Sequence, residues 1–172
     1  MAVGDSSLYY LLYTAKGRED ILKEIKILLI EDDPDHAELI MEVLVEGDIK
    51  KEVVLVRDGQ DAIDYFQESI IKWDGEVQLK IKLVILDLNL PKVDGMDVLK
   101  FLKKDSRYRL VPVIILSTSS DNKTISEAYE NGADGYVVKP ISYEEFVKNL
   151  EIIKEYCNGT RPQHPITYLR RL

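Results

Sequence analysis

Short apolar runs recur along the chain, and a helical pattern follows each of them. The runs are continuous rather than alternating, which is typical of strands buried on both faces of a parallel sheet. The helical patterns place apolar residues three and four positions apart. We predict strands at Ile25–Ile30, Val53–Val56, Leu83–Leu86, Val111–Leu116 and Tyr136–Val138, each followed by a helix.

Strict alternation of strand and helix predicts the α/β class, with helices on both faces of a parallel sheet. Right-handed crossovers restrict how such strands connect. The default for five units is the flavodoxin-like (βα)5 fold, a doubly wound parallel five-stranded sheet with strand order 2-1-3-4-5. Residues 69–82 are expected to form a long connection before the third strand.

Local signals define several helix starts. Asp33 is expected to cap the first helix, with Pro34 in its first turn. Ser142 and Glu145 have the spacing of a capping box for the last helix. The predicted α/β unit therefore spans residues 25–157, between an N-terminal extension at 1–24 and a tail at 158–172.

Composition narrows the function classes. A formal charge of −8 over 172 residues argues against nonspecific nucleic-acid binding, which requires clustered Lys and Arg. No DNA-binding domain is expected, because the tail is too short to form one. No apolar run approaches the ~20 residues needed to span a bilayer, so no membrane partner is expected. The single Cys157 and the absence of a secretory signal predict a cytoplasmic protein.

Polar side chains follow the predicted strands, at the edge where parallel strands deliver their carboxyl ends. Carboxylates crowded together raise one another's pKa unless a cation joins them. Oxygen ligands without His or Cys suit Mg²⁺, and a carboxylate between a metal and a lysine is well placed to receive a phosphoryl group. The residues at these strand ends are Glu31, Asp32, Asp87, Ser117 and Lys139.

This set of residues resembles the receiver domain of two-component response regulators. The match covers about residues 26–156 and departs mildly at Ser117, where Thr is commoner. The long connection before the third strand is similar to stand-alone regulators paired with phytochrome-type histidine kinases. The motifs that carry the resemblance are Glu31-Asp32, the run from Asp87 to Gly95 (DLNLPKVDG), Ser117 and Lys139-Pro140.

The resemblance implies a phosphoacceptor, Asp87, with Mg²⁺ as cofactor. Asp32 would bind the metal directly, Glu31 through water, and Asn89 through its backbone carbonyl. Ser117 would hydrogen-bond the phosphoryl group, and Lys139 would pair with it.

Further positions follow from the same resemblance. Tyr136 matches an aromatic residue that moves inward with the hydroxyl residue, and Pro140 would follow a cis peptide bond. Asn89 and Ser119 would tune dephosphorylation. The implied partners are a sensor histidine kinase and a downstream protein that contacts the face formed by residues 122–156. Homodimerisation through that face is left open.

Three other functions fit these residues less well. A haloacid-dehalogenase-type phosphatase also phosphorylates an aspartate, but it needs an Asp two positions later, where this chain has Asn89. A flavin carrier on this fold would not place Glu31-Asp32-Asp33 against a phosphate. A degenerate receiver that only binds partners would have lost some of the matched residues. His36 and His164 are too isolated in the sequence to predict as metal ligands.

Overall fold

The computed structural model describes residues 25–45, 51–73, 76–79 and 81–157. The predicted N-terminal extension and C-terminal tail lie outside these residues. Five strands form one sheet in the order β2-β1-β5-β6-β7, and every pairing within it is parallel. This confirms the predicted flavodoxin-like topology. The strands are β1 (Ile25–Ile30), β2 (Lys51–Val56), β5 (Ile81–Leu86), β6 (Val113–Ser117) and β7 (Gly135–Val138).

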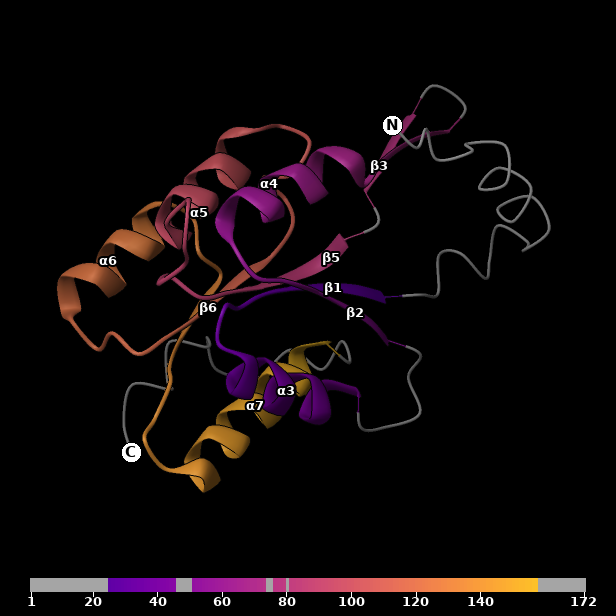
Figure 1. Ribbon diagram of the computed structural model, residues 1–172. Helices are drawn as coiled ribbons and strands as arrows, with labels where there is room; N and C mark the ends of the chain where they lie inside the picture. The colour runs from indigo at the N-terminus through magenta and orange to yellow at the C-terminus, as the bar shows by residue number, and fades with distance from the viewer. Residues whose placement is uncertain (1–24, 46–50, 74–75, 80, 158–172) are drawn as a thin grey trace.

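Helices cover both faces of the sheet (Figure 1). The helices α3 and α7 lie on one face, and α4, α5 and α6 lie on the other. Among the described residues, none of these helices has the length and apolar character needed to cross a bilayer. Their bounds are α3 (Pro34–Val45), α4 (Gly59–Glu68), α5 (Gly95–Lys104), α6 (Asn122–Glu130) and α7 (Tyr143–Cys157).

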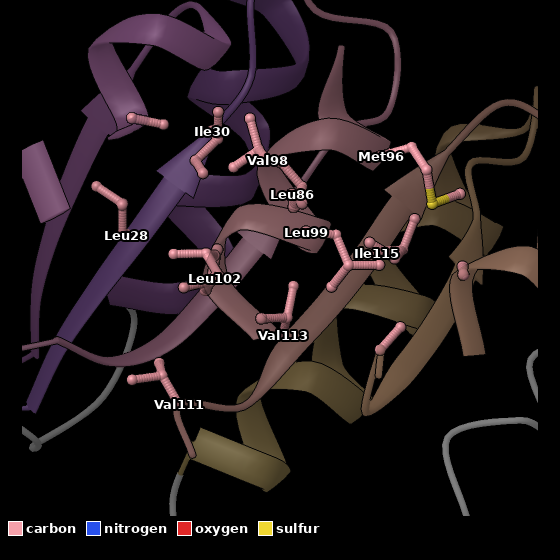
Figure 2. Packing of buried hydrophobic residues seen from close by; sticks show 14 of the residues in the cluster. Leu28, Ile30, Leu86, Met96, Val98, Leu99, Leu102, Val111, Val113 and Ile115 are labelled. Atoms are coloured by element: carbon pink, nitrogen blue, oxygen red, sulfur yellow. The ribbon is translucent and has the colours of Figure 1, made fainter. Parts of the chain in front are cut away.

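The strands supply apolar side chains to two separate cores. In β1, Leu28 and Ile30 point to the core under α4, α5 and α6, while Ile27 and Leu29 point to the core under α3 and α7. The strands β5 and β6 alternate in the same way. Figure 2 shows the first core, where Leu99 and other α5 side chains pack on these strands. Burial on both faces explains why the runs are continuous in the sequence.

A hairpin lies within the long connection that we predicted before β5. The strands β3 (Ile70–Trp73) and β4 (Glu76–Leu79) pair antiparallel as a separate two-stranded sheet. The sequence between them is Asp74-Gly75, a dipeptide favoured in two-residue hairpin loops. The connection is therefore as long as predicted, but the hairpin within it was not predicted, because its two strands lack a continuous apolar run.

The two predicted helix starts have different outcomes. Asp33 caps α3, since its Oδ1 accepts hydrogen bonds from the backbone N–H groups of Asp35 and His36 at 3.0 and 2.9 Å. The capping box before α7 is not formed as predicted. The Ser142 hydroxyl instead donates to Glu144 Oε2 at 2.8 Å, and that bond satisfies the hydroxyl next to the first turn.

Candidate functional site

The site begins where the central strands end. Glu31 follows β1, and its backbone N–H donates to the Val56 carbonyl at 3.1 Å. Asp87 follows β5, and its N–H donates to the Ile30 carbonyl at 3.0 Å. Sheet hydrogen bonding thus continues through both acidic residues and holds them at adjacent strand ends. Both side chains are buried.

Lys139 joins these two carboxylates. Its Nζ donates to Asp87 Oδ2 at 2.6 Å and to Glu31 Oε2 at 2.7 Å. The Lys139 backbone N–H donates to the Ser117 carbonyl at 2.8 Å, which anchors the residue beside β6. Because the Lys139 side chain is only 2% exposed, water screens the three charges weakly. Two buried carboxylates and one ammonium leave a net negative charge.

The acidic cluster has the composition of a site for a hard cation. One carboxylate oxygen from each of Glu31, Asp32 and Asp87 lies within 4.8 Å of the others, and Asp32 is exposed to solvent. The buried Oε1 of Glu31 has no hydrogen-bond partner within the described part of the chain. Burial raises the pKa of the Glu31 carboxyl, and the Lys139 ammonium opposes that rise. An added cation would satisfy the orphaned oxygen and offset the excess negative charge.

Asn89 lies in the loop that follows Asp87. Its backbone N–H donates to Asp87 Oδ1 at 3.0 Å and so orients that carboxylate. Its side-chain amide donates to Thr118 Oγ1 at 3.4 Å, in the segment after β6. Position 89 therefore carries an amide where a dehalogenase-type phosphatase would need a carboxylic acid.

Ser117, Ser119 and Tyr136 form the other side of the site. Ser117 is fully buried at the end of β6, and its Oγ accepts a hydrogen bond from the Ser119 N–H at 3.3 Å. The Tyr136 hydroxyl donates to the Ser119 carbonyl at 2.9 Å. Burial raises the pKa of Tyr136. The ring therefore points inward and is linked to the segment that begins at Ser117.

Comparison with known proteins assigns the family. A family model described as the response regulator receiver domain matches residues 27–151. The chain belongs to this family. Relatives of this receiver domain include the probable methanogenesis regulatory protein FilR2 of Methanothrix harundinacea. FilR2 is 38% identical over 133 residues, which cover 77% of this chain and 83% of FilR2.

Similar proteins also occur among phytochrome response regulators. Response regulator Rcp1 of Synechocystis is 32% identical over 130 residues, which cover 76% of this chain and 86% of Rcp1. A structure of phosphorylated cyanobacterial RcpA superposes with a TM-score of 0.72 at 32% identity, and covers 81% of this chain and 97% of RcpA. A structure of Rcp1 in its Mn²⁺-bound form gives a TM-score of 0.68 at 30% identity, and covers 77% of this chain and 93% of that one.

One expectation about the receiver domain was wrong. The peptide bond before Pro140 is trans, as is every other peptide bond within the described segments. The trans form is the lower in free energy for an X–Pro bond, by about 0.5–1 kcal/mol. In this arrangement Lys139 still reaches both carboxylates, so the buried ion pairs do not require the cis form.

His36 is a part of the site that the sequence analysis missed. Its Nδ1 lies 3.4 Å from Lys139 Nζ and 3.6 Å from Glu31 Oε1. Its ring meets Phe146 of α7 edge to face, with centroids 5.7 Å apart. The available signal was positional, because a helix that starts directly after a strand end keeps its first turn near that end. His36 is the third residue of α3.

Proposed function

We propose that Asp87 accepts a phosphoryl group from a sensor histidine kinase and that the acylphosphate switches the protein's contacts with partners. A carboxylate oxygen of Asp87 attacks phosphorus, the bond between phosphorus and the donor breaks, and its electron pair leaves with the donor. The observation that carries this proposal is the 2.6 Å contact between Asp87 Oδ2 and the buried ammonium of Lys139. That ammonium is poised to neutralise charge on a phosphoryl oxygen.

Mg²⁺ is the cation that we assign to the acidic cluster. Glu31, Asp32 and Asp87 would hold it together with the backbone carbonyl of Asn89. All of these are hard oxygen ligands, and the partly exposed site leaves room for the waters that Mg²⁺ retains. Bound there, Mg²⁺ would supply positive charge beside the transferring oxygens. The Mn²⁺-bound form of the similar protein Rcp1 supports a divalent ion in this role.

The switch that we propose involves Ser117 and Tyr136. The Ser117 hydroxyl would donate to a phosphoryl oxygen, and movement of the backbone around Ser119 would alter the hydrogen bond from Tyr136. The face that responds would consist of α6, β7 and α7, which would contact a downstream protein or a second copy of the chain. Asn89 and Ser119 flank the phosphoryl position and would set how fast water removes the group. On this proposal the protein acts in the cytoplasm and catalyses only its own phosphorylation and dephosphorylation.

Phosphorylation by a small donor tests the central step. Acetyl phosphate with Mg²⁺ should add one acid-labile phosphoryl group to the unmodified chain. Asp87→Asn should abolish the labelling, because the amide is a poor nucleophile. Asp97→Asn is the matched control, since Asp97 is an exposed carboxylate in the first turn of α5. Undiminished labelling of Asp87→Asn, measured by intact mass, would refute Asp87 as the acceptor.

A further inference from the structure

The loop between β5 and α5 is closed by its own hydrogen bonds. The Gly95 N–H donates to the Leu88 carbonyl at 2.9 Å, and the Val93 N–H donates to the Pro91 carbonyl at 2.8 Å. A Cβ on Gly95 would lie 2.1 Å from the Asp87 carbonyl oxygen, so the start of α5 rests directly on the Asp87 backbone. The two ends of this loop are therefore held in direct contact with each other.

Lys92 ties this loop to the neighbouring helix. Its Nζ donates to Asp58 Oδ2 at 2.6 Å, and Asp58 is buried. Asp58 also caps α4, because its Oδ1 accepts the Asp61 N–H at 2.8 Å. The hydrogen bond from Lys92 lowers the pKa of Asp58. The Asp58 carboxylate thus holds the start of α4 and the loop after β5 at the same time.

Backbone contacts reinforce this link. The Gly59 N–H donates to the Pro91 carbonyl at 3.4 Å, and a Cβ on Gly59 would lie 2.1 Å from the Val93 carbonyl oxygen. Only a glycine permits so close an approach of α4 to the loop. Lys92 itself has φ of 64°, and it is the only non-glycine residue with positive φ in the described part of the chain. Such a conformation persists where surrounding contacts impose it.

These features point to a role in the site rather than in overall stability. Lys92 is 62% exposed, and ion pairs with exposed partners contribute little to folding. Lys92 nevertheless adopts a strained backbone three residues after Asn89, whose N–H orients the Asp87 carboxylate. We propose that the Lys92–Asp58 ion pair is a latch that positions Asn89 and Asp87 for the cation. Lys92 is then a positioning residue, and this inference rests on the proposed cation site.

Magnesium affinity tests the latch directly. Lys92→Met keeps an unbranched side chain one atom shorter and removes its charge, and Asp58→Asn keeps a good cap on α4 while it removes the negative charge of the pair. Either change should raise the dissociation constant for Mg²⁺ by about fivefold, the upper range for a partly exposed ion pair. The double variant should show no further loss. Lys92→Arg should restore the affinity, because the cation returns.

Two further measurements distinguish a loss of positioning at Asn89 and Asp87 from a general loss of stability. Hydrogen exchange of the metal-free protein should become faster at the Asn89 and Gly95 amides in Lys92→Met, while its melting temperature stays within error of the parent. Lys104→Met, which alters an exposed lysine at the far end of α5, should change neither property.

The outcomes distinguish this inference from the proposed function. If the parent binds Mg²⁺ and is phosphorylated on Asp87 but Lys92→Met and Asp58→Asn bind Mg²⁺ as tightly as the parent, the latch is refuted and the proposed function stands. The latch is also refuted if the lower Mg²⁺ affinity of Lys92→Met is explained by a lower melting temperature and Lys92→Arg does not restore that affinity. A parent chain that neither binds Mg²⁺ nor takes up a phosphoryl group overturns both.

Discussion

Lys139 donates to two buried carboxylates at once, and this residue governs the charge of the site. Removing one partner from a buried ion pair leaves an uncompensated charge in a poorly solvated place. The ammonium pairs with two of the three carboxylates to which we assign a divalent cation, so the two cations would compete electrostatically. These two effects have opposite consequences for folding and for metal binding.

Lys139→Met should therefore destabilise the metal-free protein by about 3 kcal/mol, the cost of leaving buried charges unpaired. The same variant should bind Mg²⁺ more tightly than the parent, and Mg²⁺ should recover part of the lost stability. Urea unfolding with and without Mg²⁺ measures both effects. Lys148→Met on the exposed side of α7 is the control and should show neither. Equal stability of Lys139→Met and the parent without metal would contradict the buried ion pairs.

Two buried tyrosines differ in how their hydroxyl groups are satisfied. Tyr108 is fully buried against Phe66, and its hydroxyl has no hydrogen-bond partner within the described residues. The Tyr136 hydroxyl, by contrast, donates to the Ser119 carbonyl. A buried polar group without a partner costs free energy, whereas a satisfied one contributes.

Tyr108→Phe should raise the free energy of unfolding by about 1 kcal/mol, because it removes an unsatisfied hydroxyl and keeps the ring. Tyr136→Phe should lower it by about 1 kcal/mol, because the Ser119 carbonyl loses its donor. Denaturant unfolding of the two variants beside the parent provides an internal comparison. If the free energy of unfolding changed in the same direction in both variants, the two hydroxyl groups would not differ in hydrogen bonding as the structure shows.

At the scale of elements, α5 is tied directly to the site. Its first residue, Gly95, lies against the Asp87 backbone, and its Leu99 and Leu102 side chains pack in the core. The helix therefore joins the hydrophobic interior directly to the loop that follows Asp87. A side chain in place of Gly95 would have to displace either the Asp87 backbone or the α5 side chains in the core.

Gly95→Ala should cost about 3 kcal/mol, the upper range for overpacking, since a Cβ cannot fit against the Asp87 carbonyl. It should also weaken Mg²⁺ binding, because the loop that carries Asn89 must move. Thermal unfolding and calorimetric titration measure these effects. Asp97→Ala is the control. Asp97 is an exposed residue in the first turn of α5, so this change should leave the stability and the Mg²⁺ affinity nearly unchanged. Retention of parental stability by Gly95→Ala would show that α5 can shift at little cost.

The pattern of apolar residues in each strand decided whether the strand could be predicted from the sequence. Strands buried on both faces give continuous apolar runs, so β1, β5 and β6 were recognisable from the sequence. The hairpin of β3 and β4 was missed, because it lies outside the main sheet and shows no such run. Strand ends predicted which side chains gather at the site, but His36 reaches it from the first turn of α3. Its place depends on how that helix packs against α7.

At the scale of the whole molecule, the proposed switch connects the site to a surface. Ile141 and Tyr143 are exposed large apolar residues in the segment that leads from Lys139 into α7. Tyr136 lies in β7, directly before that segment. On the proposed switch, a change at Ser117 and Tyr136 would lie close in the chain to these two exposed side chains, through which we propose that a partner or a second copy docks.

Beryllofluoride, a phosphoryl mimic, should alter hydrogen exchange over residues 122–156 and change the association state of the chain. Sedimentation and exchange mass spectrometry, each with and without the mimic, measure the two responses. Asp87→Asn is the control and should respond in neither assay. If the parent binds the mimic but neither its association state nor its exchange over this face changes, the switching proposal fails, whatever the result of the phosphorylation assay.

The two-sided burial of the central strands has a consequence for folding. When one face of a strand is polar, a one-residue slip exposes apolar side chains, and the hydrophobic pattern alone enforces alignment. The strands β1 and β5 are apolar on both faces, so a slip would merely exchange one apolar set for another. It would, however, separate Glu31 or Asp87 from the Lys139 ammonium and leave a buried carboxylate unpaired. The ion pairs at the strand ends therefore favour the native alignment of β1 and β5, so the residues of the site also contribute to the register of the sheet.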